Sequence, residues 1–277
     1  MKRACVIGWP VEQSRSPLIH GYWLRRYGID GAYTREAVRP VDAGQFLRSL
    51  TLRDLVGCNV TVPHKETAFA VASERDNAAV AIGAANTVWV DNGRLHCSNT
   101  DAYGFMTHLE RSAPEWRQWD APVTLLGAGG AARAIIHGFL EAGVGEVRVF
   151  NRSVERGEGL AAHFGSRVVA RSWDERSAGS RASSVIVNTT TLGMRNVGEL
   201  GIDFAGFDAR TVVSDIVYVP LETAFLAKAR AHGLKTVDGL GMLLHQAVPG
   251  FEKWFGVRPE VTDELRAVIV ADISGRY

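Results

Sequence analysis

Short apolar runs alternate along the chain with segments whose apolar residues recur every three or four positions. The first pattern is typical of buried β-strands and the second of amphipathic helices. Gly and Pro separate the segments, and Pro17 stands where a helix favours proline in its first turn. We expect strands over residues 4–7, 32–38, 56–62, 87–90, 94–97, 123–126, 146–150, 167–170, 185–187, 211–217 and 235–237, and helices over residues 17–27, 43–50, 64–72, 240–255 and 262–273, with a further helix that continues through Leu140.

The order of these elements predicts two α/β domains. Strands and helices alternate before residue 100 and again from residue 123 onward, and the second set predicts a parallel sheet. After Gly239 the pattern is helical, and this tail needs a surface to pack on. The first section lacks covering helices, so we assign residues 1–102 and 239–277 to one domain and residues 103–238 to an inserted nucleotide-binding domain, with the catalytic cleft between them.

A glycine-rich segment, Gly127-Ala128-Gly129-Gly130-Ala131, follows the apolar run 123–126 and opens a helical pattern. The first Gly permits a tight turn, the second lets the backbone approach a pyrophosphate, and the helix N-terminus supplies N–H donors. An ordinary strand-to-helix turn is the alternative. The complete order of strand, loop, helix and second strand favours a dinucleotide site.

The end of the second strand indicates which dinucleotide binds. An acidic residue there would bind a ribose 2′-hydroxyl, whereas a cation suits a 2′-phosphate. This strand ends in Asn151, Arg152 and Ser153, and Arg156 lies one helical turn further on. The sequence therefore predicts NADP(H) rather than NAD(H).

Three polar clusters in the first domain carry candidate chemistry. A nicotinamide enzyme that oxidises an alcohol needs a group that accepts the hydroxyl proton and a neighbour that orients that group. Ser14 and Ser16 precede a helix, where they cap it or donate to an anion. Thr61 and Lys65 follow a strand halted by proline, although a lysine there is commonly only a solvated surface residue. Asp101 begins a helical stretch, where its alternative role is a helix cap.

The composition limits the kinds of molecule that the protein is expected to bind. The net charge is +1 and the Lys and Arg residues are dispersed, which argues against a nucleic-acid binder and favours a small-molecule substrate. No apolar stretch reaches the length of a membrane helix. Cys5, Cys58 and Cys97 show no paired spacing, so we expect free thiols, no metal site and a reducing, cytoplasmic location.

Taken together, the motifs resemble the shikimate dehydrogenase family over essentially the whole chain. Ser-x-Ser-Pro, Asn-Val-Thr-Val-Pro-x-Lys, Gly-Ala-x-Asn-Thr, Asn-Thr-Asp, Gly-Ala-Gly-Gly-Ala and Asn-Arg-Ser-x-x-Arg occur in the family's order. The resemblance implies reversible, NADPH-dependent reduction of 3-dehydroshikimate to shikimate in aromatic amino acid biosynthesis. It also implies a substrate domain and a Rossmann-like NADP domain, with the C-terminal helices returning to the substrate domain, in a monomer or homodimer.

The same resemblance implies roles for individual residues. Lys65 would be the general base toward the C3 hydroxyl, and the acid in reverse, with Asp101 orienting both Lys65 and the substrate. Ser14 and Ser16 would bind the substrate carboxylate. The remaining implied contacts are Thr61, Asn86, Tyr218 and Gln246 near the substrate hydroxyls, Asn151, Arg152, Ser153 and Arg156 around the adenosine 2′-phosphate, and Ile216, Gly239 and Met242 beside the nicotinamide.

Two alternatives stay open at this point. A quinate/shikimate dehydrogenase accepts a C1-hydroxylated substrate and often uses NAD, but the Asn151-Arg152 strand end and the Ser14–Ser16 pair argue against it. A nucleotide-binding regulator would have lost Lys65 or Asp101, and both are present. Departures from the family pattern are mild: Asn77 stands where many members carry an acidic residue near the cofactor.

Overall fold

The computed structural model describes residues 1–275, which pack as two compact units. The first unit combines residues 1–102 with the described residues from Leu244 onward, and the second is Tyr103–Leu243. Residues 239–243 thus pack with the second unit, although the helical pattern after Gly239 predicts that they belong to the first. A physical reason is visible at Gly241, where an added Cβ would lie 2.0 Å from Nδ1 of His108 in the second unit.

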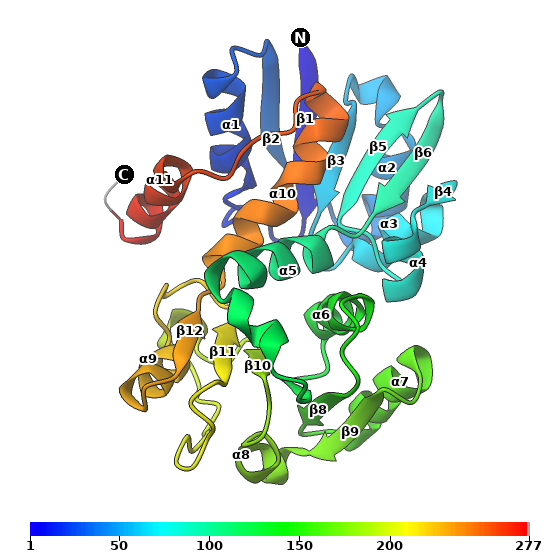
Figure 1. Ribbon diagram of the computed structural model, residues 1–277. Helices are drawn as coiled ribbons and strands as arrows, with labels where there is room; N and C mark the ends of the chain where they lie inside the picture. The colour runs from blue at the N-terminus through cyan, green and yellow to red at the C-terminus, as the bar shows by residue number, and fades with distance from the viewer. Residues whose placement is uncertain (276–277) are drawn as a thin grey trace. The chain divides into compact units, whose positions relative to one another are not determined.

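The first unit contains a six-stranded mixed sheet in the order β2-β1-β3-β5-β6-β4 (Figure 1). Strand β1 is parallel to β2 and β3, and β5 is antiparallel to β3 and β6. The carboxyl ends of β1, β3 and β6 and the amino end of β5 therefore share one edge. The strands are β1 Lys2–Gly8, β2 Gly31–Ala37, β3 Gly57–Val60, β4 Glu74–Arg75, β5 Thr87–Asp91 and β6 Arg94–Ser98.

Helices cover both faces of this sheet. α2 and α3 pack on the face that carries Cys5 and Cys58, whereas α1 and α10 cover the face that carries Tyr33 (Figure 1). The helices of this unit are α1 Ser16–Arg26, α2 Ala43–Arg48, α3 Lys65–Val71, α4 Asn77–Ile82, α11 Asp263–Ile273, and most of α10 Leu240–Phe255.

Tryptophans fix the return of the C-terminal helices to this unit. Trp254 of α10 donates from Nε1 to the Val88 carbonyl at 3.0 Å, and Trp23 of α1 donates to the Glu260 carbonyl at 2.9 Å. Trp254 lies so close to β3 that a Cβ on Gly57 would be 2.1 Å from its Nε1. The predicted return of these helices is confirmed.

The second unit contains a six-stranded, fully parallel sheet in the order β12-β11-β10-β7-β8-β9, as the alternating pattern predicts. The chain reverses direction across the sheet between β7 and β10, the switch point at which such sheets bind nucleotides. The strands are β7 Val123–Leu126, β8 Val147–Asn151, β9 Val168–Ser172, β10 Val185–Asn188, β11 Val212–Asp215 and β12 Lys235–Val237.

Separate apolar layers lie on the two faces of the second sheet. Phe105 and Phe139 belong to one layer, and Phe204 and Phe225 belong to the other. The helices of this unit are most of α5 Asp101–Ser112, α6 Gly130–Glu141, α7 Val154–Phe164, α8 Arg176–Gly179 and α9 Ala224–Ala231. Short 3-10 helices in the two units cover Pro40–Asp42, Thr51–Arg53, Pro114–Gln118, Trp173–Glu175 and Met194–Asn196.

Some local expectations need adjustment. Strand β3 ends at Val60 rather than at residue 62, and Lys65 begins helix α3, within the helix expected over residues 64–72. Strand β4 and helices α4, α7, α8 and α9 were given no range from the sequence. Cys5, Cys58 and Cys97 are buried free thiols, as expected. Among the described residues, no helix has the length and apolar character needed to cross a membrane.

Candidate active site

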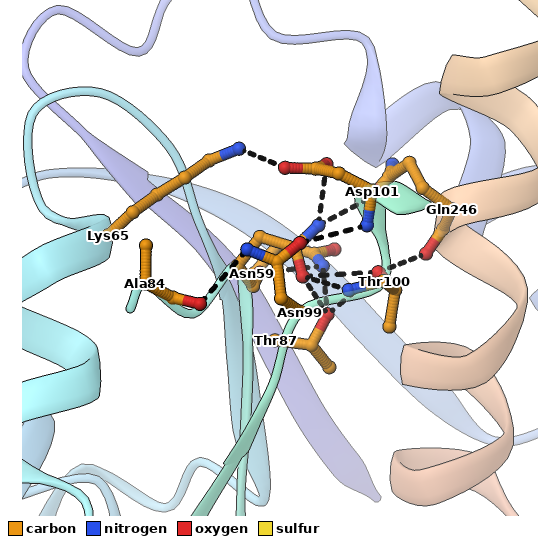
Figure 2. Close-up of polar contacts among 9 residues, drawn as sticks. Asn59, Lys65, Ala84, Thr87, Asn99, Thr100, Asp101 and Gln246 are labelled. Atoms are coloured by element: carbon orange, nitrogen blue, oxygen red, sulfur yellow. Dashed lines mark hydrogen bonds and ion pairs between the residues drawn. The ribbon is translucent and has the colours of Figure 1, made fainter. Parts of the chain in front are cut away.

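Lys65 and Asp101 form an ion pair at the edge of the first sheet where β3 and β6 end. Lys65 is the first residue of α3 and Asp101 the first residue of α5. The ammonium Nζ donates to Asp101 Oδ2 at 2.5 Å. The lysine side chain keeps 31% of its surface exposed and the aspartate 12%, so the pair is sheltered yet open to a ligand. Figure 2 shows Lys65 extending from its helix to the carboxylate.

The backbone around Lys65 is fixed on both sides. The Ala85 N–H donates to the Lys65 carbonyl at 2.9 Å, which ties the start of α3 to the segment before β5. The buried ring of His64 bonds the Val38 carbonyl at 2.7 Å. These contacts position Lys65 without using its amine.

Asn86 connects Asp101 to the rest of the site. Its Nδ2 donates to Asp101 Oδ1 at 2.8 Å and lies 3.3 Å from Gln246 Oε1, which projects from α10. Its Oδ1 accepts from the Thr100 N–H at 2.8 Å. Thr100 in turn donates from Oγ1 to the Gln246 carbonyl at 2.8 Å (Figure 2). Asn86, Asp101 and Gln246 are thus brought together, as part of one hydrogen-bond network with Lys65.

Sequence reasoning assigned no role to three residues in this network. Asn99 accepts from the Asp101 N–H at 3.1 Å and donates to the Ala84 carbonyl at 2.9 Å. Buried Asn59 donates to the Asn86 carbonyl at 3.2 Å. Thr100, between Asn99 and Asp101, bonds both Asn86 and Gln246. The Asn-Thr-Asp motif contained two of these residues, but spacing alone did not show that they hold Asp101.

Ser14 lies in the segment between β1 and α1, and Ser16 is the first residue of α1. The Ser14 hydroxyl donates to the Ser16 hydroxyl at 3.3 Å. Arg35 of β2 fixes this segment, because its Nε and Nη2 donate to the Ser14 carbonyl at 2.9 and 2.7 Å. The N-cap of α1 is Arg15, whose side chain makes no capping bond. Thr61 lies just past β3, where its N–H donates to the Ile7 carbonyl at 2.9 Å.

The glycine-rich segment of the second unit lies at the switch point. Gly127 has φ +110°, and an added Cβ would lie 2.6 Å from Thr190 Cγ2, so glycine is required there. An added Cβ on Gly129 or Gly130 would meet no atom within 4 Å. Ala128 and Ala131 flank Gly129 and Gly130, and α6 begins at Gly130 with its N–H groups directed toward this open space. This space and these donors fit a pyrophosphate.

The turn after β8 supplies the predicted cation pair. Arg152 and Arg156 are exposed, and neither guanidinium has an ion-pair partner within residues 1–275. The Asn151 side chain forms hydrogen bonds within the protein. Its Oδ1 accepts from the Ala128 N–H at 3.2 Å, and its Nδ2 donates to the Ser153 carbonyl at 2.7 Å. Asn151 therefore holds the glycine-rich segment against the turn. The Ser153 hydroxyl donates to Glu155 at 2.7 Å, and this bond lowers the pKa of Glu155.

The ends of β11 and β12 bring Ile216 and Gly239 together. A Cβ on Gly239 would lie 2.4 Å from the Ile216 carbonyl oxygen, so only glycine permits this approach. Ile216 and Met242 are partly buried against the apolar core of their unit. Tyr218 is half-buried in the same β11–α9 connection, in the second unit, whereas the other predicted substrate contacts lie in the first unit.

Comparison with known proteins identifies similar sequences over the whole chain. Residues 6–88 match a shikimate dehydrogenase substrate binding domain model, residues 111–194 a shikimate/quinate 5-dehydrogenase model, and residues 239–268 a shikimate 5'-dehydrogenase C-terminal domain model. A shikimate dehydrogenase (NADP(+)) of Brucella abortus (strain S19) is 55% identical, over 99% of this chain and 95% of the relative.

Solved structures show the same similarity. A shikimate 5-dehydrogenase of Thermus thermophilus, in complex with NADP(H) and shikimate, is 35% identical with a TM-score of 0.87, over 98% of this chain and 100% of that one. A quinate dehydrogenase of Corynebacterium glutamicum, in complex with NAD, is 28% identical with a TM-score of 0.89, over 98% of this chain and 99% of that one.

Proposed function

Because this chain belongs to the shikimate dehydrogenase family, we propose that it catalyses the reversible, NADPH-dependent reduction of 3-dehydroshikimate to shikimate in aromatic amino acid biosynthesis. The observation that carries the proposal is the 2.5 Å ion pair between Lys65 and Asp101. The Lys65 ammonium carries a transferable proton, and the Asp101 carboxylate holds that ammonium in place. The interconversion of an alcohol and a ketone requires both functions.

When held by the second unit, NADPH would supply the hydride that the substrate carbonyl carbon needs. The carbonyl oxygen then needs one proton, which the Lys65 ammonium donates. In the oxidation direction the Lys65 amine accepts the proton of the C3 hydroxyl as the carbonyl forms. Asp101 stabilises the ammonium form throughout, and Asn86 keeps the carboxylate of Asp101 turned toward Lys65.

We assign the substrate contacts by chemistry and by the family resemblance. The hydroxyls of Ser14 and Ser16 bind the carboxylate, near the N-terminus of α1, which favours an anion. Thr61, Asn86, Tyr218 and Gln246 take the substrate hydroxyls, and Asp101 orients the reacting one. An amide and a hydroxyl each both donate and accept, which matches a polyhydroxylated ring.

We assign the cofactor to the carboxyl edge of the second sheet. The open space above Gly129 and Gly130 supports a pyrophosphate there, and exposed Arg152 and Arg156 support a 2′-phosphate. Ser153 supplies a hydroxyl near the 2′-phosphate, and Asn151 shapes the pocket. Ile216, Gly239 and Met242 supply an apolar surface for the nicotinamide.

We also expect the protein to act in the cytoplasm, as a monomer or homodimer. Three buried free thiols support a reducing location. The dispersed charge supports small-molecule ligands rather than nucleic acid or membrane partners.

The deciding experiment measures initial rates of nicotinamide reduction with shikimate or quinate, each paired with NADP or NAD. Wild type, Lys65→Ala and the control Glu66→Gln are compared, since Glu66 is exposed on the same helix. We expect turnover confined largely to shikimate with NADP, a loss of about 10²- to 10⁴-fold in kcat for Lys65→Ala, and no loss for the control.

Calorimetric titration separates binding from chemistry in the same proteins. Lys65→Ala should still bind shikimate. Comparable rates with quinate or NAD would instead make the protein a quinate/shikimate dehydrogenase. Intact NADP binding without any turnover would make it a nucleotide-binding regulator.

A further inference from the structure

Asp215 is a buried carboxylate that takes no part in the proposed chemistry. It is the last residue of β11, and only 1% of its surface is exposed. Burying an ionisable group is costly unless several donors compensate. Burial raises the pKa of Asp215 to about 6, although three hydrogen bonds act in the opposite direction. Such a group calls for an explanation beyond packing.

The three donors to Asp215 come from three different segments. Oδ1 accepts from the Val217 N–H and from Asn188 Nδ2, each at 2.9 Å, and Oδ2 accepts from Thr223 Oγ1 at 2.7 Å. Val217 belongs to the connection that leaves β11. Asn188 ends the neighbouring strand β10, and Thr223 is the N-cap of α9. One side chain thus joins two strand ends and a helix start.

Asn188 extends this connection toward the glycine-rich segment. Its Oδ1 accepts from the Thr190 N–H at 3.0 Å and from Thr190 Oγ1 at 2.7 Å. The Thr190 methyl group packs so closely on Gly127 that an added Cβ there would be 2.6 Å away. Contacts therefore run without interruption from Asp215 through Asn188 and Thr190 to Gly127.

We propose that Asp215 is a positioning residue for the cofactor: it fixes the connection that carries Ile216 and, through Asn188 and Thr190, the glycine-rich segment. This role rests on the proposed function, because Ile216 and Gly127 are assigned there to the nicotinamide and the pyrophosphate. Asp215 itself does not touch the cofactor in this role. It sets the relative position of two segments that do.

The test measures the Kd for NADP of purified protein by calorimetric titration, independently of turnover. Asp215→Ala removes both acceptor oxygens and with them all three hydrogen bonds, and we expect its Kd to rise by at least about tenfold. Asp215→Asn keeps an oxygen for Val217 and Asn188, and its amide can donate to the Thr223 hydroxyl, so its Kd should stay within about threefold of wild type.

Thr211→Val is the matched control. Thr211 is buried just before the amino end of β11 and donates to the Ser183 carbonyl at 2.9 Å. This variant loses a buried hydrogen bond beside the same strand, far along it from Asp215. It should lower the thermal midpoint and leave the Kd for NADP unchanged. An equal rise in Kd for Thr211→Val and Asp215→Ala would reduce Asp215 to a general structural residue and overturn the proposal.

Thr190→Val keeps the assignment testable if Asp215→Ala does not fold. The substitution retains the methyl group against Gly127 and the N–H bond to Asn188. It removes the hydroxyl that donates to Asn188 and accepts from the Leu192 N–H at 3.0 Å, so the Kd should rise by about three- to tenfold. An unchanged Kd would overturn the proposed connection. A wild-type protein that binds no NADP would overturn the proposed function itself, which separates the two failures.

Discussion

Asn86 Nδ2 lies 2.8 Å from Asp101 Oδ1, on the opposite oxygen from the one that Lys65 contacts. The amide therefore fixes the rotation of the carboxylate, and the carboxylate fixes the ammonium. A residue that orients a catalytic pair affects turnover as well as binding.

Asn86→Ala should lower kcat by about 10- to 100-fold and raise the KM for shikimate, because the carboxylate loses its fixed orientation. Steady-state kinetics with saturating NADP checks both values. Asn92→Gly, at an exposed hairpin position with φ +49°, is the control and should keep wild-type rates. A variant that changed KM alone would limit Asn86 to substrate binding.

Arg152→Ala should raise the KM for NADP by about tenfold, because a charge-assisted contact to the 2′-phosphate is lost. The KM for NAD should stay unchanged. Arg171 of β9 is also exposed, and Arg171→Ala serves as the control. Equal effects on both dinucleotides would place Arg152 away from the 2′-phosphate.

Glu155→Gln should lower the KM for NADP by about two- to fivefold at low salt. The Ser153 hydroxyl donates to Glu155 and lowers its pKa, so an anion stands beside the proposed 2′-phosphate pocket at neutral pH. Removing that charge relieves repulsion and weakens the hold on the Ser153 hydroxyl, because an amide oxygen is a weaker acceptor than a carboxylate. Glu158→Gln, also exposed on α7, should have little effect, and the gain for Glu155→Gln should fade in high salt.

The stability of the protein should depend on the protonation of Asp215. Burial raises its pKa from the ordinary 3.8 to about 6, so the folded protein retains a proton between these values that the unfolded chain releases. Ionisation of this buried carboxyl therefore lowers the free energy of unfolding as the pH rises from 3.8 to about 6, and the loss is complete above that range. Relative to Asp215→Asn, the wild-type free energy of unfolding should rise by about 1 kcal/mol from pH 7 to pH 5. Urea titrations at the two pH values measure this, and a constant difference would contradict it.

Gly57→Ala should destabilise the protein by about 3 kcal/mol or more, because the new methyl group would displace Trp254 and the Val88 carbonyl. The added Cβ would lie 2.1 and 2.3 Å from their atoms. Gly21→Ala is the control, since a Cβ on that α1 residue meets only Arg25, at 3.4 Å. Thermal unfolding compares the two, and similar midpoints would mean that α10 can shift on the sheet.

Local patterns predicted most elements because their causes are local. The hairpin at Asp91-Asn92-Gly93 and the turn at Gly127 need backbone angles that Gly and Asn adopt readily, and these residue types are visible in the sequence. Helix α4 has six residues and no repeated apolar face, so periodicity could not reveal it. Strand β3 ends at Val60, where its pairing with β1 ends opposite Ile7, and this end depends on a partner distant in sequence.

In the site, too, some features follow from the local sequence and others from contacts between residues distant in sequence. Lys65 and Asp101 were recognisable through family motifs, but their pairing depends on how α3 and α5 begin at one sheet edge. The motif predicts Asn151 at the cofactor, and it could not show that both polar atoms of its side chain also bond within the protein. The network around Asn188 could not be predicted, because its members come together only when two parallel strands align.

The two-segment composition of the first unit has a consequence for synthesis. The ribosome makes residues 1–102 first, but the helices that cover Trp23 and the β3–β5 face come from residues beyond 244. The second unit is continuous, so all its residues are available once Leu243 has been made, before the last segment of the first unit. The segment that emerges first is thus the last to be completed, and it must wait with an apolar sheet face exposed, the condition in which nascent chains depend on chaperones.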